Sequence, residues 1–118
     1  MDIYQIIQED LMFVHTTIIK VNPDKVKEAS AILFSEKIMT FYSTIQGLQR
    51  GYLIESVDEP GKLISLSFWD SMADARRTMS DPAYAGLIED IRSLLIAAPE
   101  RYSYSLLNEI TPEQLKTN

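Results

Sequence analysis

The stretch Gly47–Asp74, GLQRGYLIESVDEPGKLISLSFWDSMAD, decides the fold of this chain. It predicts a strand, a tight turn, a second strand that ends at Trp69, and a helix that begins at Asp70 or Ser71. The turn falls at Asp58–Gly61, because proline presets φ at about −65° and the glycine after it accepts the positive φ of a type II turn. An aspartate or serine after the second strand can accept a hydrogen bond from a free N–H of the first helical turn. The stretch therefore predicts a β-hairpin that leads directly into a helix.

The segments on either side of this hairpin predict further strands and helices. Their periodicities indicate strands over Met12–Lys20 and Arg101–Asn108. They indicate a long helix from Pro23 to about Thr44, and two helical pieces over Ser71–Met79 and from Pro82 to the stop at Pro99. Asn22 and Asp81 are predicted N-caps, because each precedes a proline at a first helical position. Gly47 is expected to end the long first helix within a residue or two of its position.

The resulting order is β-α-β-β-α-β, the split βαβ or ferredoxin-like pattern of the α+β class. It predicts one antiparallel four-stranded sheet with both long helices on one face. We expect a single domain over residues 12–108, preceded by an extension at 1–11 and followed by a tail at 109–118. In the extension, Ile3, Ile6 and Ile7 recur at helical spacing and can dock on the body or on a partner.

The predicted strands are apolar on both faces, which a sheet covered by helices on one side does not need. In Leu63–Trp69, one face carries Ile64, Leu66 and Phe68, and the other carries Leu63 and Trp69 around two serines. A second apolar face needs a second cover, and the sequence predicts no third layer of helices. We therefore expect a homodimer in which two sheets close face to face around a cavity, a dimeric α+β barrel.

Composition excludes several classes of function. The length of 118 residues predicts one domain. The net charge of −6 argues against nucleic-acid binding, because proteins that bind nucleic acid need basic patches. The absence of cysteine excludes disulfides, cysteine-ligated zinc and thiol nucleophiles. No apolar run is long enough to cross a bilayer, and the acidic first ten residues do not form a secretory signal. We expect a cytoplasmic protein that does not associate with membranes.

Several short motifs resemble the antibiotic biosynthesis monooxygenase (ABM) domain family of the dimeric α+β barrel superfamily. The resemblance covers about residues 12–107 and rests on Gly47–Tyr52, Asp58–Gly61, Ser67–Ser71 with Ala73 and Ala75, and Ser80–Tyr84. It implies a homodimer with a pocket between each sheet and its helices or the partner. It also implies, for some members, cofactor-free oxygenation of quinols or polyaromatic phenols. Other members degrade haem, and others have no known reaction.

Two departures from the family pattern narrow this reading. The haem-degrading branch uses a histidine on the helix after the tryptophan as iron ligand, whereas the single histidine here is His15, in the first strand. Some quinol-oxidising members carry an asparagine near the tryptophan, where this chain has Ser65 and Ser67. The first departure argues against the haem-degrading branch, and the second sets this chain apart from the quinol-oxidising members that use that asparagine.

The candidate site residues follow from side-chain chemistry. Trp69 can stack a planar ligand as a catalytic wall, and His15 can act as a general base for a phenolic proton. Substrate contacts are expected from Tyr52, Ser65, Ser67, Tyr102 and Tyr104. Each also has a structural interpretation, since Trp is commonly buried in a core or dimer seam and strand tyrosines are common in packing. We therefore expect a cofactor-independent monooxygenase for a small quinol or phenol or, alternatively, a non-catalytic dimeric module that binds a small molecule or is purely structural.

Overall fold

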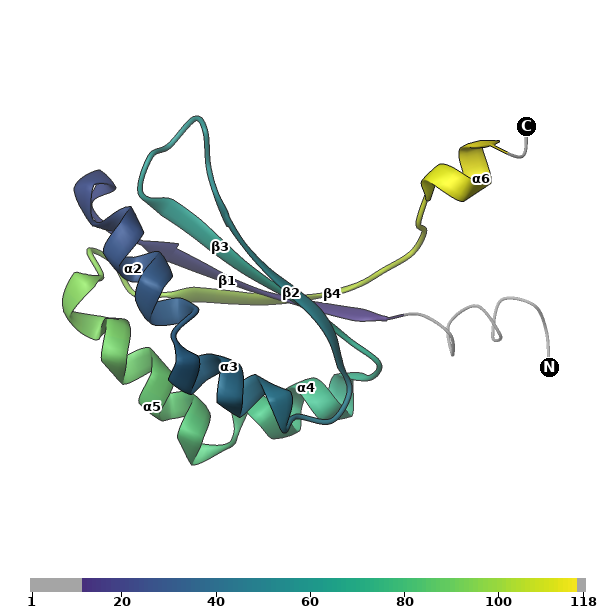
Figure 1. The fold of residues 1–118 in the computed structure, drawn as a ribbon, viewed down its shortest axis with the longest axis horizontal. Coiled ribbons are helices and arrows are strands. Elements are labelled where there is room, and N and C mark those ends of the chain that lie inside the picture. The colour runs from purple at the N-terminus through teal and green to yellow at the C-terminus, as the bar shows by residue number, and fades with distance from the viewer. Residues whose placement is uncertain (1–11, 117–118) are drawn as a thin grey trace.

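The computed structural model describes residues 12–116, and within them the elements follow the predicted order (Figure 1). The expected extension at 1–11 lies outside the described residues. The four strands are β1 (Phe13–Lys20), β2 (Leu48–Glu55), β3 (Lys62–Trp69) and β4 (Glu100–Ser105). The helices are η1 (Pro23–Lys25), α2 (Val26–Leu33), α3 (Glu36–Ser43), α4 (Met72–Met79), α5 (Pro82–Ile91), η2 (Arg92–Leu94) and α6 (Pro112–Lys116).

The strands form one antiparallel sheet in the order β2-β3-β1-β4. Helices α2 to α5 all lie on one side of this sheet (Figure 1). This is the predicted ferredoxin-like arrangement, so the α+β fold class is confirmed. β1 and β3 occupy the centre and pair along their whole length, from Phe13 opposite Trp69 to Lys20 opposite Lys62. The central pair therefore fixes which side chains share a face.

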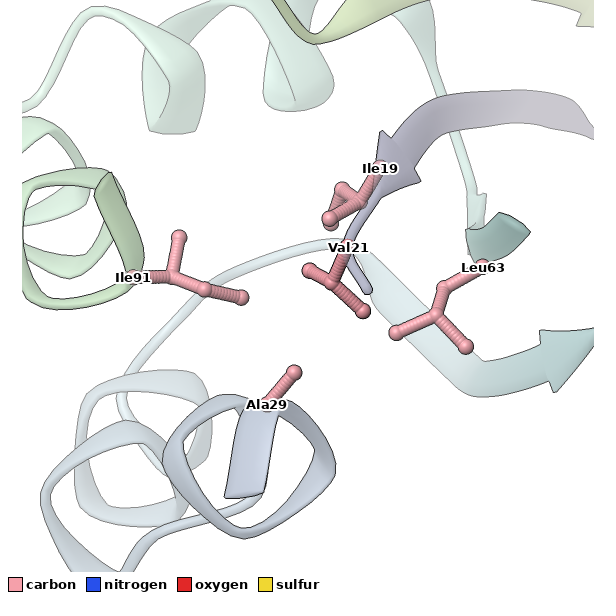
Figure 2. Close-up of a cluster of buried hydrophobic side chains, with 5 residues drawn as sticks. All are labelled: Ile19, Val21, Ala29, Leu63 and Ile91. Carbon is pink, nitrogen blue, oxygen red and sulfur yellow. The ribbon is translucent and has the colours of Figure 1, made fainter. Parts of the chain in front are cut away.

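A small cluster of buried apolar side chains joins the sheet to two helices. Ile19 and Leu63 from the central strands and Val21 just beyond β1 point toward Ala29 of α2 and Ile91 of α5 (Figure 2). All five are almost fully buried. Because burial of apolar surface is the main favourable term in folding, this cluster fixes α2 and α5 against the sheet.

The predicted hairpin turn is confirmed in detail. Gly61 has a φ of 91°, as a type II turn requires at this position. The Lys62 N–H donates a hydrogen bond to the Glu59 carbonyl oxygen at 3.1 Å, which closes the turn. A Cβ on Gly61 would also collide with the carbonyl oxygen of Val21. Glycine is therefore required at this position for two independent reasons, its backbone conformation and its close approach to the backbone just after β1.

The helices differ from the prediction at their boundaries. The single helix predicted from Pro23 to about Thr44 is divided at Phe34–Ser35, and the Ser35 hydroxyl caps α3 by accepting from the Ile38 N–H at 3.4 Å. An apolar period of 3.6 continues through this break, so periodicity alone could not reveal it. The Asn22 side chain makes no cap bond, whereas Asp81 accepts from the Ala83 N–H at 2.9 Å as predicted.

The two faces of the sheet have different surroundings. The inner face, which faces the helices, carries His15, Thr17, Ile19, Gly51, Leu63, Ser65, Ser67, Trp69, Arg101 and Ser103. The outer face carries Val14, Thr16, Ile18, Tyr52, Ile54, Ile64, Leu66, Phe68, Tyr102 and Tyr104. Within residues 12–116 no helix lies over the outer face (Figure 1). Tyr52, Ile54, Tyr102 and Tyr104 are accordingly about half exposed.

Candidate functional site

A cavity of about 150 Å³ lies between the inner face of the sheet and the helices α2, α3 and α5. It lies within one chain, between the sheet and its own helices, which is one of the two places that the ABM resemblance implies for a pocket. It lies on the opposite side of the sheet from the face-to-face cavity that the apolar pattern of the strands predicts. Its walls are formed by Thr17, Ile19, Leu33, Phe34, Ile38, Met39, Tyr42, Leu48, Gly51, Tyr52, Ser65, Leu66, Ser67, Tyr84 and Ile88. Phe34 and Met39 are about half exposed, so they form its rim toward solvent.

The sheet supplies a polar floor to this cavity. Thr17 of β1 and Ser65 of β3 are paired neighbours, and both face the helices, as does Ser67. Gly51 of β2 lies opposite Ser67, and a Cβ there would meet only the Leu66 carbonyl oxygen at 3.5 Å. Because that is an ordinary van der Waals distance, the missing side chain of Gly51 leaves open space above the floor rather than relieving a clash.

The helices supply an apolar roof with two phenol groups. Ile38 and Tyr42 come from α3, and Tyr84 and Ile88 come from α5. Burial, with a further contribution from the neighbouring Tyr84, raises the pKa of Tyr42 to about 12. Tyr42 is therefore a neutral hydrogen-bond donor over the whole physiological pH range.

Trp69 lies beside the cavity floor and makes a hydrogen bond to one of its residues. Its ring is 1% exposed, and its Nε1–H donates to Ser67 Oγ at 2.8 Å. Ser67 Oγ in turn donates to the carbonyl oxygen of His15 at 3.4 Å. The indole of Trp69 thus does not form part of the cavity wall, but it holds the hydroxyl group of Ser67, which does.

His15 lies on the inner face, two residues before Thr17, and its Cα is paired with those of Ser67 and Ser103. Its Nδ1 lies 3.4 Å from Ser103 Oγ, and its Nε2 is buried with no hydrogen-bond partner in the described chain. Burial lowers the pKa of His15, and the positive charge of Arg101 lowers it further. The imidazole is therefore neutral at pH 7, and one of its nitrogens is an acceptor.

The three tyrosines predicted to bind substrate project from the outer face. Tyr102 and Tyr104 of β4 alternate with Arg101 and Ser103, which face inward, and neither lines the cavity. Tyr52 follows Gly51 and contributes to the cavity wall, while its ring packs edge-on against Phe68 on the outer face at 6.0 Å between centroids. The structure thus brings Ser65 and Ser67 together in the cavity, places His15 and Trp69 next to it, and separates Tyr102 and Tyr104 from it.

Comparison with known proteins gives a likeness at the level of the fold. No family model and no curated protein matches this sequence. A monooxygenase from the gene ActVA-Orf6 of Streptomyces coelicolor, solved with the ligand nanaomycin D, superposes with a TM-score of 0.77 at 20% identity, over 87% of this chain and 94% of that one. A putative antibiotic biosynthesis monooxygenase from Caulobacter crescentus gives 0.72 at 15% identity, over 89% and 98%. The chain has the fold of ABM domains.

That ABM likeness extends beyond proteins with an assigned reaction. A conserved protein from Methanosarcina mazei superposes with a TM-score of 0.69 at 15% identity, over 82% of this chain and 94% of that one. Since all of these identities are low, the likeness supports the resemblance that the sequence analysis stated and does not assign a reaction or substrate.

The two phenol groups of the cavity roof, Tyr42 and Tyr84, are absent from the sequence-based candidates. Each belongs to an apolar helical stripe, where a tyrosine is typical of a core position. Their sequence separation and the break between α2 and α3 hide the fact that they line one cavity. A signal was available in Tyr84, which belongs to the Ser80–Tyr84 motif that supported the ABM resemblance.

The described residues offer neither a metal site nor a membrane-spanning helix. Residues 12–116 contain no group of three histidine or carboxylate side chains able to hold a metal ion. Among the same residues, no helix combines the length and apolar character needed to span a bilayer.

Proposed function

We propose that the protein is a cofactor-independent monooxygenase that oxidises a small quinol or phenol in the cavity between the sheet and its helices. The observation that carries this proposal is the cavity itself, with hydroxyl groups on the sheet side and aromatic and aliphatic side chains on the helix side. Ligand pockets of enzymes combine a mostly apolar lining with a few placed polar groups in this way. The fold likeness to a monooxygenase solved with nanaomycin D supports the same class of reaction.

The proposed reaction begins with removal of the phenolic proton. The resulting anion is electron-rich and transfers electrons to O₂, after which oxygen bonds to a ring carbon that bears hydrogen. One oxygen atom of O₂ becomes a quinone carbonyl, and the other leaves as water with the two hydrogens that the substrate loses. The substrate supplies all four electrons, and the apolar roof excludes water from the intermediate.

His15 is the proposed base. In the tautomer whose Nδ1–H donates to Ser103 Oγ, the neutral imidazole has Nε2 as an acceptor, and Nε2 has no partner in the described chain. Ser67 lines the cavity and is the strand partner of His15, so it lies between the imidazole and the cavity. Trp69 is proposed to act through Ser67, because its Nε1–H fixes the position of that hydroxyl group. Ser65 and Ser67 are the proposed substrate contacts on the floor.

A homodimer is part of this proposal. The outer face presents Tyr52, Ile54, Tyr102 and Tyr104 about half exposed, together with the other apolar side chains of that face. An exposed apolar sheet face of this kind typically marks an interaction surface. A second copy of the chain, bound through the same face, would cover it on both protomers. Tyr102 and Tyr104 are then proposed to serve the dimer contact rather than the substrate.

The alternative function is a non-catalytic dimeric module that binds a small molecule in the same cavity. One observation favours it specifically, since neither His15 nor Trp69 contributes to the cavity wall. In this case a ligand stabilises the folded state and raises the melting temperature, but it is recovered unchanged.

Oxygen consumption separates the two functions. We expect the protein to consume O₂ when it is incubated with a panel of naphthoquinols and anthrones, and to release the quinone in equal amount. His15→Ala should slow this turnover by about a hundredfold, the lower range for loss of a general base. Arg77→Ala, on the exposed side of α4, provides a control variant with unchanged turnover. Binding without turnover across the panel would favour the non-catalytic module.

A further inference from the structure

Among the described residues, those that line the cavity include no charged side chain. All fifteen residues that line it are apolar residues, glycine, serine, threonine or tyrosine. Transfer of a charged group into such surroundings is costly unless an opposite charge or a full set of hydrogen bonds meets it. A carboxylate, phosphate or ammonium group of a ligand would find no counter-charge there. The composition of the wall therefore selects for ligands that are uncharged where they enter the cavity.

The tyrosines of the roof do not change this preference for uncharged ligands. The pKa of Tyr42 lies far above neutrality, so its hydroxyl neither carries a negative charge nor takes a proton from a ligand. Arg101 lies 5.9 Å from the ring centroid of Tyr84, but it is exposed and does not line the cavity. Tyr42 is thus a neutral group in a wall whose described residues carry no charged side chain.

The same tyrosines can nevertheless recognise one feature of a ligand. Within the described part of the chain, the O–H of Tyr42 and that of Tyr84 make no hydrogen bond to protein, in contrast to the Ser67 hydroxyl and the Trp69 N–H of the floor. Burial raises the pKa of Tyr42 to about 12, so its hydroxyl is a donor at any physiological pH. A ligand oxygen that reaches the roof would therefore accept a hydrogen bond from a donor that no protein group engages in the described chain.

We propose that Tyr42 is the specificity-determining residue of this cavity, where its O–H donates a hydrogen bond to the oxygen of an uncharged, ring-sized phenol or ketone. This inference rests on the cavity of the proposed function, but it concerns binding and does not require turnover. The volume agrees with it, because a cavity of about 150 Å³ resembles engineered apolar cavities that hold one benzene ring. Larger ligands can extend past the rim at Phe34 and Met39.

Three ring-sized probes test this proposal by titration calorimetry at pH 7. The probes are 4-methylphenol, toluene, which lacks the oxygen, and 4-methylbenzoate, which carries a charge. The wild-type chain should bind 4-methylphenol most tightly, and 4-methylbenzoate no more tightly than toluene. Tyr42→Phe should weaken binding of 4-methylphenol by about two- to tenfold, the range for one hydrogen bond, and leave the affinity for toluene unchanged. Toluene is therefore the matched control for the variant, and it also reports whether the cavity remains folded.

Two results would overturn the proposal. One is equal affinity of wild type and Tyr42→Phe for 4-methylphenol, and the other is a preference of the wild type for 4-methylbenzoate. Failure of all three probes to bind would remove both the proposal and the cavity-based function. Binding as expected with no oxygen consumption by any quinol would leave Tyr42 in its role and contradict only the monooxygenase.

Discussion

The inner and outer faces of the sheet come from the same strands but have opposite relations to the rest of the chain. On the inner face, helices cover the strands, and small side chains at Thr17, Ser65 and Ser67 leave a cavity. On the outer face, large apolar side chains such as Phe68 and Tyr104 meet no further layer of the described chain. Small polar residues therefore lie on the face where a ligand can be enclosed, and apolar residues lie on the face that no other part of residues 12–116 covers. This contrast underlies the proposal that one face serves a ligand and the other a second copy of the chain.

The largest effect is expected from a substitution that disrupts the outer face. Ile64 lies at its centre, paired with Ile18 and Ile54 on the neighbouring strands. Ile64→Asp would place an unpaired carboxylate in the proposed dimer contact, which costs about 3 to 5 kcal/mol when the charge is buried. Because about 1.4 kcal/mol corresponds to a tenfold change in affinity, the dimer dissociation constant should rise by about a hundredfold or more. Sedimentation equilibrium measures this constant.

A matched control tests whether the face or merely the added charge is responsible. Val57, in the hairpin turn, is 94% exposed, so Val57→Asp should leave association unchanged. A wild-type protein that remains monomeric at high concentration, or an Ile64→Asp variant that dimerises normally, would contradict the role given to the outer face.

A smaller effect is expected when the inner face is filled. Gly51→Val adds a side chain above the cavity floor without a backbone clash, and valine is a better strand residue than glycine. Binding of 4-methylphenol should weaken by at least about tenfold, or 1.4 kcal/mol, while the melting temperature stays the same or rises. Gly86→Ala serves as control, because a Cβ at this position in α5 meets nothing within 4 Å. Unchanged binding by Gly51→Val would place the ligand elsewhere.

The smallest expected effect concerns His15 and pH. Because the pKa of His15 is lowered in the folded chain, the unfolded chain takes up its proton first as the pH falls below about 6.5. The free energy of unfolding should therefore decrease from pH 7.5 to 5.5, and His15→Gln should lose part of that decrease. Melting curves of both proteins at the two pH values measure the difference. An equal decrease in both would show that the imidazole is not shielded as described.

The sequence predicted those parts of the molecule that depend on neighbours along the chain. Pro60-Gly61 specifies its turn through backbone dihedral angles, and Asp81 specifies a helix start through a hydrogen bond to a residue two positions away. The order of the elements, and hence the sheet, follows from such local signals together with the rules of strand connection. The same reasoning missed the break at Ser35, since capping there competes with an uninterrupted apolar period.

The candidate site was less accessible to this reasoning because it depends on which face each strand turns toward the helices. A shift of one residue exchanges the two faces, so the sequence could group Tyr102 with Ser65 although they project to opposite sides. The cavity also requires α3 and α5 to meet over the floor, which no local pattern encodes. Ser65 and Ser67 were found through their position next to Trp69, whereas Tyr42 became a candidate only in three dimensions.

The most direct test of the division between the faces is a methyl NMR spectrum of isoleucine-labelled protein. Ile19, Ile38 and Ile88 line the cavity, whereas Ile18, Ile54 and Ile64 lie on the outer face. Addition of 4-methylphenol should shift the signals of the first three, and dilution of the protein should shift those of the second three. The opposite pattern, with the ligand acting on the outer isoleucines and dilution on those of the cavity, would contradict the assignment of ligand and partner to the two faces.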